Sequence, residues 1–206
     1  WSPAASLLLL ANKPEQKGFS VLDVRCGSQE IQELSPVGDF PLVNPSPSWA
    51  PEGERVALNS RAGTMEVVDF RARPAKVTSI ATGNNGFYCW DCAWSPDGRW
   101  VAGLSYARSG TWQVAGIDTA TPDGVIRPLT PSQDVQIASV TWANAPWLLF
   151  TTQNGQGLGP SYASRVDALP TTDRVGFPDN ARLSPTGDWV AFVGECGGTR
   201  TVRVCL

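Results

Sequence analysis

One short motif recurs along the chain at nearly even spacing. It consists of a large apolar residue, Ser-Pro or Ala-Pro, one further residue and Gly, and an apolar run follows it at 49–53, 94–98 and 183–187. Degenerate copies begin at Trp1 and Trp142, so the motif starts at positions 1, 49, 94, 142 and 183, with spacings of 48, 45, 48 and 41 residues. A period of roughly 40 to 50 residues with short strands is typical of β-propeller blades.

Each repeat unit predicts four antiparallel strands. One strand ends at the large apolar residue, and a turn follows, because Pro presets φ and Gly accepts a positive φ. An apolar strand such as 189–193 comes next, then an alternating strand such as 64–70 and a weaker one such as 75–80. We therefore predict an all-β chain with almost no helix: a β-propeller of about five four-stranded blades, or part of a larger one.

The repeat also predicts where the blades begin and end. As one domain, they are expected at approximately 1–40, 41–91, 92–138, 139–180 and 181–206, the first and last being incomplete. A sandwich of short strands is the alternative architecture, which the fixed period disfavours.

The motif residues are expected to anchor the blades rather than to carry chemistry, because large aromatic side chains and turn residues are what blade packing needs. These anchors are Trp49, Trp94, Trp142, Pro51, Pro96, Pro185, Gly53, Gly98 and Gly187. Three further tryptophans that begin apolar strands are expected in the core: Trp100, Trp147 and Trp189.

The composition excludes several classes of function. With 42% apolar and 17% charged residues the chain is globular, and its net charge of −3 argues against a basic nucleic-acid-binding surface. The chain has no His, which removes Ser–His triads, His general bases and His metal ligands. We predict no catalytic residue, no cofactor and no metal. No apolar run approaches the roughly 20 residues of a membrane span.

The motif resembles the repeat of TolB-like β-propellers, also called the WD-repeat-like β-propeller repeat. Residues 94–98, Trp-Ser-Pro-Asp-Gly, match its usual form fully, whereas 49–53 and 183–187 match in part. The resemblance covers nearly the whole chain, although the fourth unit has Ala-Asn-Ala-Pro at 143–146 in place of Pro-Asp-Gly. It is specific for the fold and not for a function, because propellers host unrelated activities.

The resemblance implies an accessory protein outside the cytoplasm: extracellular, periplasmic or at the cell surface. We expect a non-catalytic scaffold that binds a protein or peptide and no nucleic acid, either alone or as part of a larger chain or assembly. Two alternatives stay open. Resembling proteins include propellers that gate a serine peptidase domain of the α/β-hydrolase type, and the chain could instead be the extracellular sensor domain of a receptor.

Two of the five cysteines form the sequence Cys89-Trp90-Asp91-Cys92. This spacing can belong to a redox pair at a helix start or to half of a zinc site, but no helix is expected here and no second such pair exists. The remaining interpretations are a local disulfide, two buried thiols, or disulfides to other cysteines.

The second candidate pair is Cys196 and Cys205. Gly197-Gly198 between them predicts a two-residue hairpin turn, which pairs Cys196 with Thr199 and places Cys205 opposite Val190. The two sulfur atoms would then lie roughly 20 Å apart at ~3.3 Å per residue. A disulfide between them requires a wider, irregular loop.

A polar, glycine-rich stretch at 153–161 is the best candidate for contacting a partner, because loops carry recognition. We expect it to be a flexible loop rather than a phosphate-binding loop, since it opens no helix. The candidate contact residues are Gln153, Asn154, Gln156 and Tyr162. An aromatic platform at Trp90 or Trp112 is the other candidate ligand contact.

Overall fold

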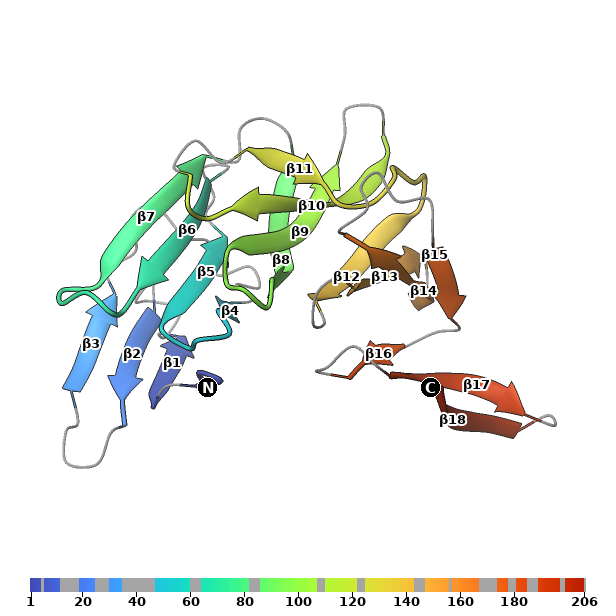
Figure 1. Ribbon diagram of the computed structural model, residues 1–206, viewed down its shortest axis with the longest axis horizontal. Helices are drawn as coiled ribbons and strands as arrows, with labels where there is room; N and C mark the ends of the chain where they lie inside the picture. The colour runs from blue at the N-terminus through green and yellow to red at the C-terminus, as the bar shows by residue number, and fades with distance from the viewer. Residues whose placement is uncertain are drawn as a thin grey trace.

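The computed structural model consists of strands and turns, and the part of the chain that it describes contains no helix (Figure 1). It describes residues 1–4, 6–11, 19–24, 30–34, 47–59, 64–81, 86–106, 110–121, 125–142, 147–155, 157–166, 174–177, 181–184, 189–196 and 199–205. The all-β prediction is confirmed. No helix in these ranges is long and apolar enough to cross a membrane.

The described strands form five antiparallel sheets that follow one another along the chain. The first sheet contains β1 (Leu7–Ala11), β2 (Phe19–Asp23) and β3 (Glu30–Leu34). The second contains β4 (Ser48–Trp49), β5 (Arg55–Asn59), β6 (Thr64–Asp69) and β7 (Lys76–Ala81). The third contains β8 (Phe87–Trp94), β9 (Trp100–Tyr106), β10 (Trp112–Asp118) and β11 (Ile126–Pro128).

The last two sheets repeat the same order of strands. The fourth contains β12 (Gln136–Trp142), β13 (Trp147–Asn154), β14 (Gly157–Arg165) and β15 (Arg174–Phe177). The fifth contains β16 (Arg182–Leu183), β17 (Val190–Cys196) and β18 (Thr199–Cys205). Because each sheet is a simple meander, each is one blade of the arrangement that the repeat predicted.

The sheets lie along an arc in chain order (Figure 1). The first strand of each middle sheet lies on the inner side of the arc, where β8 packs beside both β4 and β12. The outer strands β3, β7, β11 and β15 lie on the other side. This places the Trp-containing strands next to one another, as packing between blades requires.

The third and fourth sheets begin earlier than the repeat suggested. Residues 87–91 belong to β8, and Gln136 already begins β12, so the expected boundaries at 92 and 139 cut through the inner strands. The motif marks the end of each inner strand and carries no information about its start. That the five sheets make up one domain stays a prediction.

The turn motif has the geometry that its residues predict. Gly53 and Gly98 adopt φ of 77° and 68°, in the left-handed region that favours glycine. In both turns the glycine N–H donates to a backbone carbonyl three residues back, that of Ala50 or Ser95, at 2.9 Å. The Asp97 carboxylate accepts hydrogen bonds from the Ser95 hydroxyl and from the Arg99 amide.

Apolar clusters fill every interface between successive sheets. The central strand β9 shows why: Val101 packs toward the second sheet, whereas Ala102 and Leu104 pack toward the fourth. Successive side chains of a strand point to opposite faces, so a strand between two sheets must be apolar throughout. Trp189 does not follow this prediction, because it precedes β17 and is 41% exposed.

Candidate functional site

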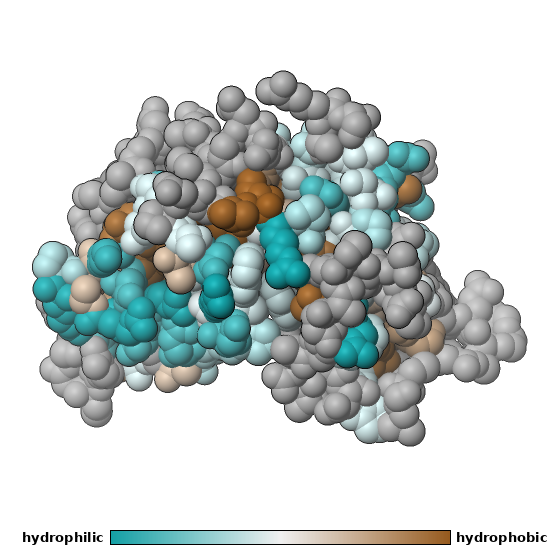
Figure 2. All heavy atoms as spheres, turned by 45° about the horizontal axis from the view of Figure 1, so that its top comes forward, coloured by the Kyte–Doolittle hydropathy of each residue, from teal (hydrophilic) through white to brown (hydrophobic). Residues whose placement is uncertain are grey.

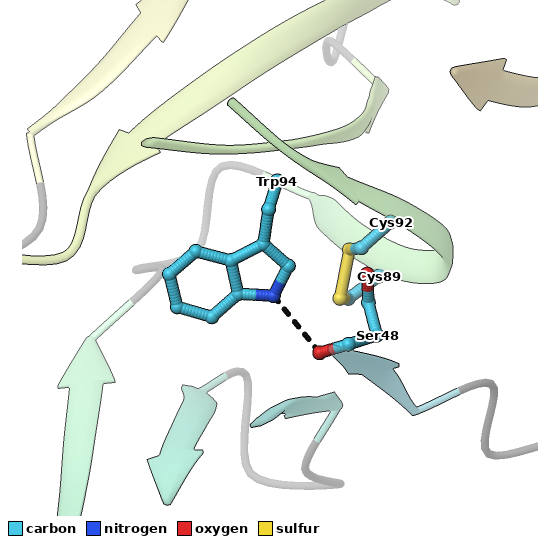
Figure 3. Close-up of a disulfide and its surroundings, with 4 residues drawn as sticks. All are labelled: Ser48, Cys89, Cys92 and Trp94. Atoms are coloured by element: carbon cyan, nitrogen blue, oxygen red, sulfur yellow. Dashed lines mark hydrogen bonds between the residues drawn. A yellow bond between two sulfur atoms is a disulfide. The ribbon is translucent and has the colours of Figure 1, made fainter. Parts of the chain in front are cut away.

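Trp94 lies between the second and third sheets. Its side chain is buried in the cluster that the two sheets share, and its indole Nε1 donates a hydrogen bond of 2.9 Å to the backbone carbonyl of Ser48 in β4 (Figure 3). The carbonyl belongs to the neighbouring inner strand. Trp94 therefore joins two blades through both packing and a directed hydrogen bond.

Arg55 fixes the third blade's turn against the second blade. Its Nη2 donates to the carbonyl of Gly98 at 2.7 Å, its Nε lies 2.5 Å from a carboxylate oxygen of Glu52, and its guanidinium lies 4.9 Å from the centre of the Trp94 ring. Ser2 makes the corresponding contact one blade earlier, since its hydroxyl donates to the carbonyl of Gly53 at 2.7 Å. Through these contacts the turn of the motif is bound to the preceding blade.

The other anchor residues differ in their surroundings. Trp49 is half-buried and packs on Phe70, with ring centres 5.8 Å apart. Trp142 is also half-buried, and its Nε1 is buried with no hydrogen-bond partner among the described residues. Pro51 is exposed in its turn and Pro96 half-buried. Pro185 and Gly187 lie outside the described residues.

A disulfide between Cys89 and Cys92 closes a bulge in β8, with Cα atoms 4.9 Å apart (Figure 3). Tyr88 pairs with Leu104 and Ala93 pairs with Ala102, so four residues of β8 stand opposite a single residue of β9. Both cysteines are buried in the cluster beside Trp94. Of the alternatives that the spacing left open, the structure has the local disulfide.

Gly103 is the single residue opposite the bulge. A Cβ atom built there would lie 2.5 Å from Cζ of Phe87 and 2.8 Å from the carbonyl oxygen of Tyr88. The absence of a side chain therefore permits the close approach of the two backbones. The bulge thus depends on residues of both strands.

Asp91 occupies the exposed part of the bulge. Its carboxyl reaches solvent but is partly surrounded by protein, and this partial burial raises its pKa. The positive charge of Arg182 in β16 acts in the opposite direction and is the smaller effect. Asp91 in the inner strand of the third sheet and Arg182 in that of the fifth therefore interact electrostatically.

The other two cysteines of the candidate pairs lie at opposite ends of the last hairpin. Cys196 pairs with Thr199, and Cys205 pairs with Val190. This is the register expected from the two glycines, and it is not compatible with a disulfide between Cys196 and Cys205.

The expected partner loop at 153–161 is a hairpin instead. β13 extends to Asn154 and β14 begins at Gly157, and Gln153 pairs with Leu158. Glycines favour a flexible loop, but Asn154 pairs with Gly157, and a two-residue connection that starts with glycine, as at 155–156, is also a favoured hairpin turn. The prediction of a flexible loop at 153–161 was therefore wrong.

The four candidate residues of that stretch separate into different roles. Gln153 and Asn154 are exposed at the hairpin end. Tyr162 is half-buried and stacks on Phe150 with ring centres 5.5 Å apart, which gives it a role in the core. Gln156 lies outside the described residues.

Three chain segments meet at this end of the third and fourth sheets. We call the exposed residues Tyr106, Val135, Gln153, Asn154 and Leu158, together with the half-buried Trp112, the hairpin surface. The segments are joined edge to edge. Trp112 and Gln133 exchange two backbone hydrogen bonds of 2.7 Å, and Gln136 pairs with Gln153. The hairpins of two blades and the segment between them therefore form one continuous rim.

The hairpin surface exposes apolar side chains. Tyr106, Val135 and Leu158 are 40%, 45% and 43% exposed. The Tyr106 and Trp112 rings pair across the strands, with centres 4.8 Å apart and planes inclined at 52°. Over the described atoms of the face in Figure 2, hydrophilic and neutral residues predominate and strongly hydrophobic ones appear in separate spots.

Similar solved structures were found by comparing whole folds. TolB from Acinetobacter baumannii has a TM-score of 0.62 at 18% identity, covering 99% of this chain and 51% of that one. An oligogalacturonate lyase in complex with manganese has a TM-score of 0.70 at 11% identity, covering 97% and 59%. The chain has the fold of a TolB-like β-propeller.

In a third solved structure, the match to this chain covers a smaller part of the solved chain. Dipeptidyl peptidase 4 from Porphyromonas gingivalis has a TM-score of 0.58 at 14% identity, covering 96% of this chain and 36% of that one. This TolB-like propeller chain therefore spans about half, three fifths and a third of the three chains it resembles. No protein-family model and no curated protein matches the sequence.

In a TolB-like propeller the hairpin surface is one end of two neighbouring blades. Sequence reasoning identified parts of it, namely Gln153, Asn154 and the candidate platform at Trp112, but did not bring them together. It missed Tyr106, Val135 and Leu158. The available signal was the repeat itself: the strand after the motif runs in the same direction in successive blades, so the hairpins that follow end at the same side of the propeller.

Proposed function

We propose that this chain is a non-catalytic propeller scaffold that binds a protein or peptide outside the cytoplasm. One observation carries the proposal: Tyr106, Val135 and Leu158 are exposed on three segments that hydrogen bonds join into one rim. Exposed apolar side chains that gather at one place, edged by polar ones, mark interaction sites. Gln153 and Asn154 supply that polar edge.

Side chains that strand pairing holds in place suit recognition, because a partner does not have to order them on binding. Tyr and Trp bury large areas at a small conformational cost, which is why they dominate the energetics of interfaces. The Tyr106–Trp112 pair is already held by the register of β9 and β10. The surface is therefore suited to binding without further rearrangement.

The compartment is inferred from the disulfide. Disulfides persist in oxidising surroundings and are rare in the cytoplasm, and the one between Cys89 and Cys92 is buried in the packing of two blades. Alkylation of the unfolded protein from its native source, with and without prior reduction, tests this. Protection of both cysteines before reduction supports the proposal, and two free thiols contradict it.

Selection from an unbiased peptide library displayed on phage tests the binding function. We expect peptides that bind the wild-type chain and bind the Tyr106→Ala, Leu158→Ala double variant weakly. Mass spectrometry of the peptide after incubation should return it unchanged. Cleaved peptide would contradict a non-catalytic role, and selected peptides that bind both proteins equally would contradict the site.

A second candidate is the accessory propeller of a larger protein, either a gated serine peptidase or a receptor. The observation in its favour is that this chain matches only 36% of a dipeptidyl peptidase 4 chain and about half of the TolB chain. The intact mass of the protein in its native source distinguishes the two. A mass well above 22.0 kDa favours the larger protein, and a mass near that value favours the separate scaffold.

A further inference from the structure

We propose that the hairpin surface binds a proline-rich peptide segment in the polyproline II conformation. This inference rests on the proposed function and adds the chemical class of the partner. It follows from three properties of the surface: its aromatic pair, its hydrogen-bond donors and the small number of charged side chains among its described residues.

The aromatic pair comes first. The Tyr106 and Trp112 rings have centres 4.8 Å apart, and their planes are inclined, so the two rings do not cover each other face to face. Tyr106 is 40% exposed, whereas Trp112 is half-buried and packs on the core below. Proline-rich segments dock on aromatic side chains, and the register of β9 and β10 places Tyr106 opposite Trp112.

The second property is the set of donors beside the rings. Proline has no backbone N–H, so a proline-rich segment offers carbonyl oxygens that need donors from the partner. The exposed carboxamides of Gln153 and Asn154 can each donate two hydrogen bonds, and the Tyr106 hydroxyl can donate one. A segment that crosses from the aromatic pair to the β13–β14 hairpin would meet all three.

The third property is charge. Among the described residues of the three segments, at 106, 110–113, 131–136, 153–155 and 157–158, Asp134 is the only charged side chain. Strongly acidic or phosphorylated peptides are bound by clusters of arginine, which these positions lack. An uncharged, apolar and carbonyl-rich segment fits them better.

Apolar contacts extend along the same path. Val135 and Leu158 are both nearly half exposed, and the pairing of Gln136 with Gln153 and of Gln153 with Leu158 places their segments side by side. A polyproline II segment is extended and already ordered, so it contacts successive hairpin ends at a low entropic cost. This is why we infer an extended segment that follows the rim.

The experiment uses two fluorescent peptides of equal length. One has prolines at every third position and apolar residues between them, and the other has alanine in place of each proline. Fluorescence anisotropy measures the binding of each to the wild-type chain, to Tyr106→Ala and to Trp189→Ala. Trp189 is the matched control, because it is an aromatic residue of similar exposure, 41%, that lies just before β17 and away from the hairpin surface.

We expect the proline peptide to bind the wild-type chain and the Trp189→Ala variant equally, and to bind Tyr106→Ala about tenfold or more weakly, the effect of losing an interface anchor. The alanine peptide should bind at least about tenfold less well than the proline peptide. Equal binding of the two peptides, or of Tyr106→Ala and wild type, overturns the inference.

The outcome of the phage selection separates the two proposals. If selected peptides need Tyr106 but contain no proline-rich segment, the scaffold function stands and the polyproline inference fails. If selection yields no peptide that depends on the hairpin surface, the proposed site fails as well.

Discussion

The indole nitrogen of Trp94 donates a hydrogen bond of 2.9 Å to the backbone carbonyl of Ser48, and this bond connects the inner strands of two successive blades. Trp142 occupies the same position of the repeat one blade later, yet its buried Nε1 has no hydrogen-bond partner among the described residues. The repeat therefore preserves the side chain but not its polar contact.

The two tryptophans should respond differently to replacement by phenylalanine. Trp94→Phe leaves the Ser48 carbonyl without its donor, and we expect it to lower the free energy of unfolding by about 1–3 kcal/mol. Trp142→Phe removes a buried, unsatisfied N–H, so its polar contribution is favourable and the net loss should be smaller. Urea denaturation of both variants measures this; a larger loss for Trp142→Phe contradicts the assignment.

Gly103→Ala should destabilise the third blade. The new Cβ would lie 2.8 Å from the Tyr88 carbonyl oxygen, a backbone atom that cannot move without altering the bulge. We expect a loss of about 1–3 kcal/mol in denaturation experiments, as for other overpacked sites. Gly155→Ala is the control for the added methyl group, since a Cβ there meets nothing within 4 Å. Equal losses at both positions would argue against the bulge.

Removing the disulfide should also lower stability. Cross-linking a loop as short as that between Cys89 and Cys92 is worth roughly 2 kcal/mol in the chain-entropy model. We expect the Cys89→Ser, Cys92→Ser double variant to lose about that much, or more, because two hydroxyls enter an apolar cluster. Reducing agent should lower the stability of the wild type and leave the variant unchanged. An unaffected wild type would show that this bond does not form.

Asp118 should make stability depend on pH. Hydrogen bonds from the Arg99 guanidinium hold the pKa of its carboxyl below the usual range, although partial burial acts in the opposite direction. The folded pKa is thus lower than the unfolded value of about 3.9, so this stabilisation is present above that pH and is lost as the pH falls through the folded pKa.

The variant Asp118→Asn tests this dependence. The stability difference from wild type should be largest at about pH 7 and shrink toward about pH 3. Asp134→Asn is the control, because it changes the net charge equally and leaves the pair of Arg99 and Asp118 intact. A difference for Asp118→Asn that stays constant over this range would mean that the ion pair contributes nothing to folding.

The sequence predicted the fold because one repeat contains mutually consistent signals. The turn at 94–98 gave the end of an inner strand, and the apolar run after it gave a strand buried on both faces, as found for β9. The starts of the inner strands were harder to predict, since nothing in the motif marks Phe87 or Gln136 as the first residue of a strand. Trp189 shows the limit of hydropathy alone, because it is exposed although it precedes an apolar strand.

The candidate site was less predictable, for a physical reason. Tyr106 and Leu158 are far apart in the sequence, and only the register of two hairpins and the segment between them brings them to the same end of two blades. The pairing of Tyr106 with Trp112 depends on which residues face each other across β9 and β10. Composition counts such residues but cannot place them at one end of a propeller.

The most direct test of the central claim is a footprint of a bound peptide by amide hydrogen exchange. A peptide selected from an unbiased library is added to the wild-type chain, and exchange is compared with and without it. We predict slower exchange at 110–113, 132–136 and 153–158, with little change in β8 or in the fifth sheet. Protection confined to the inner strands, or absent from the hairpin surface, would contradict the account.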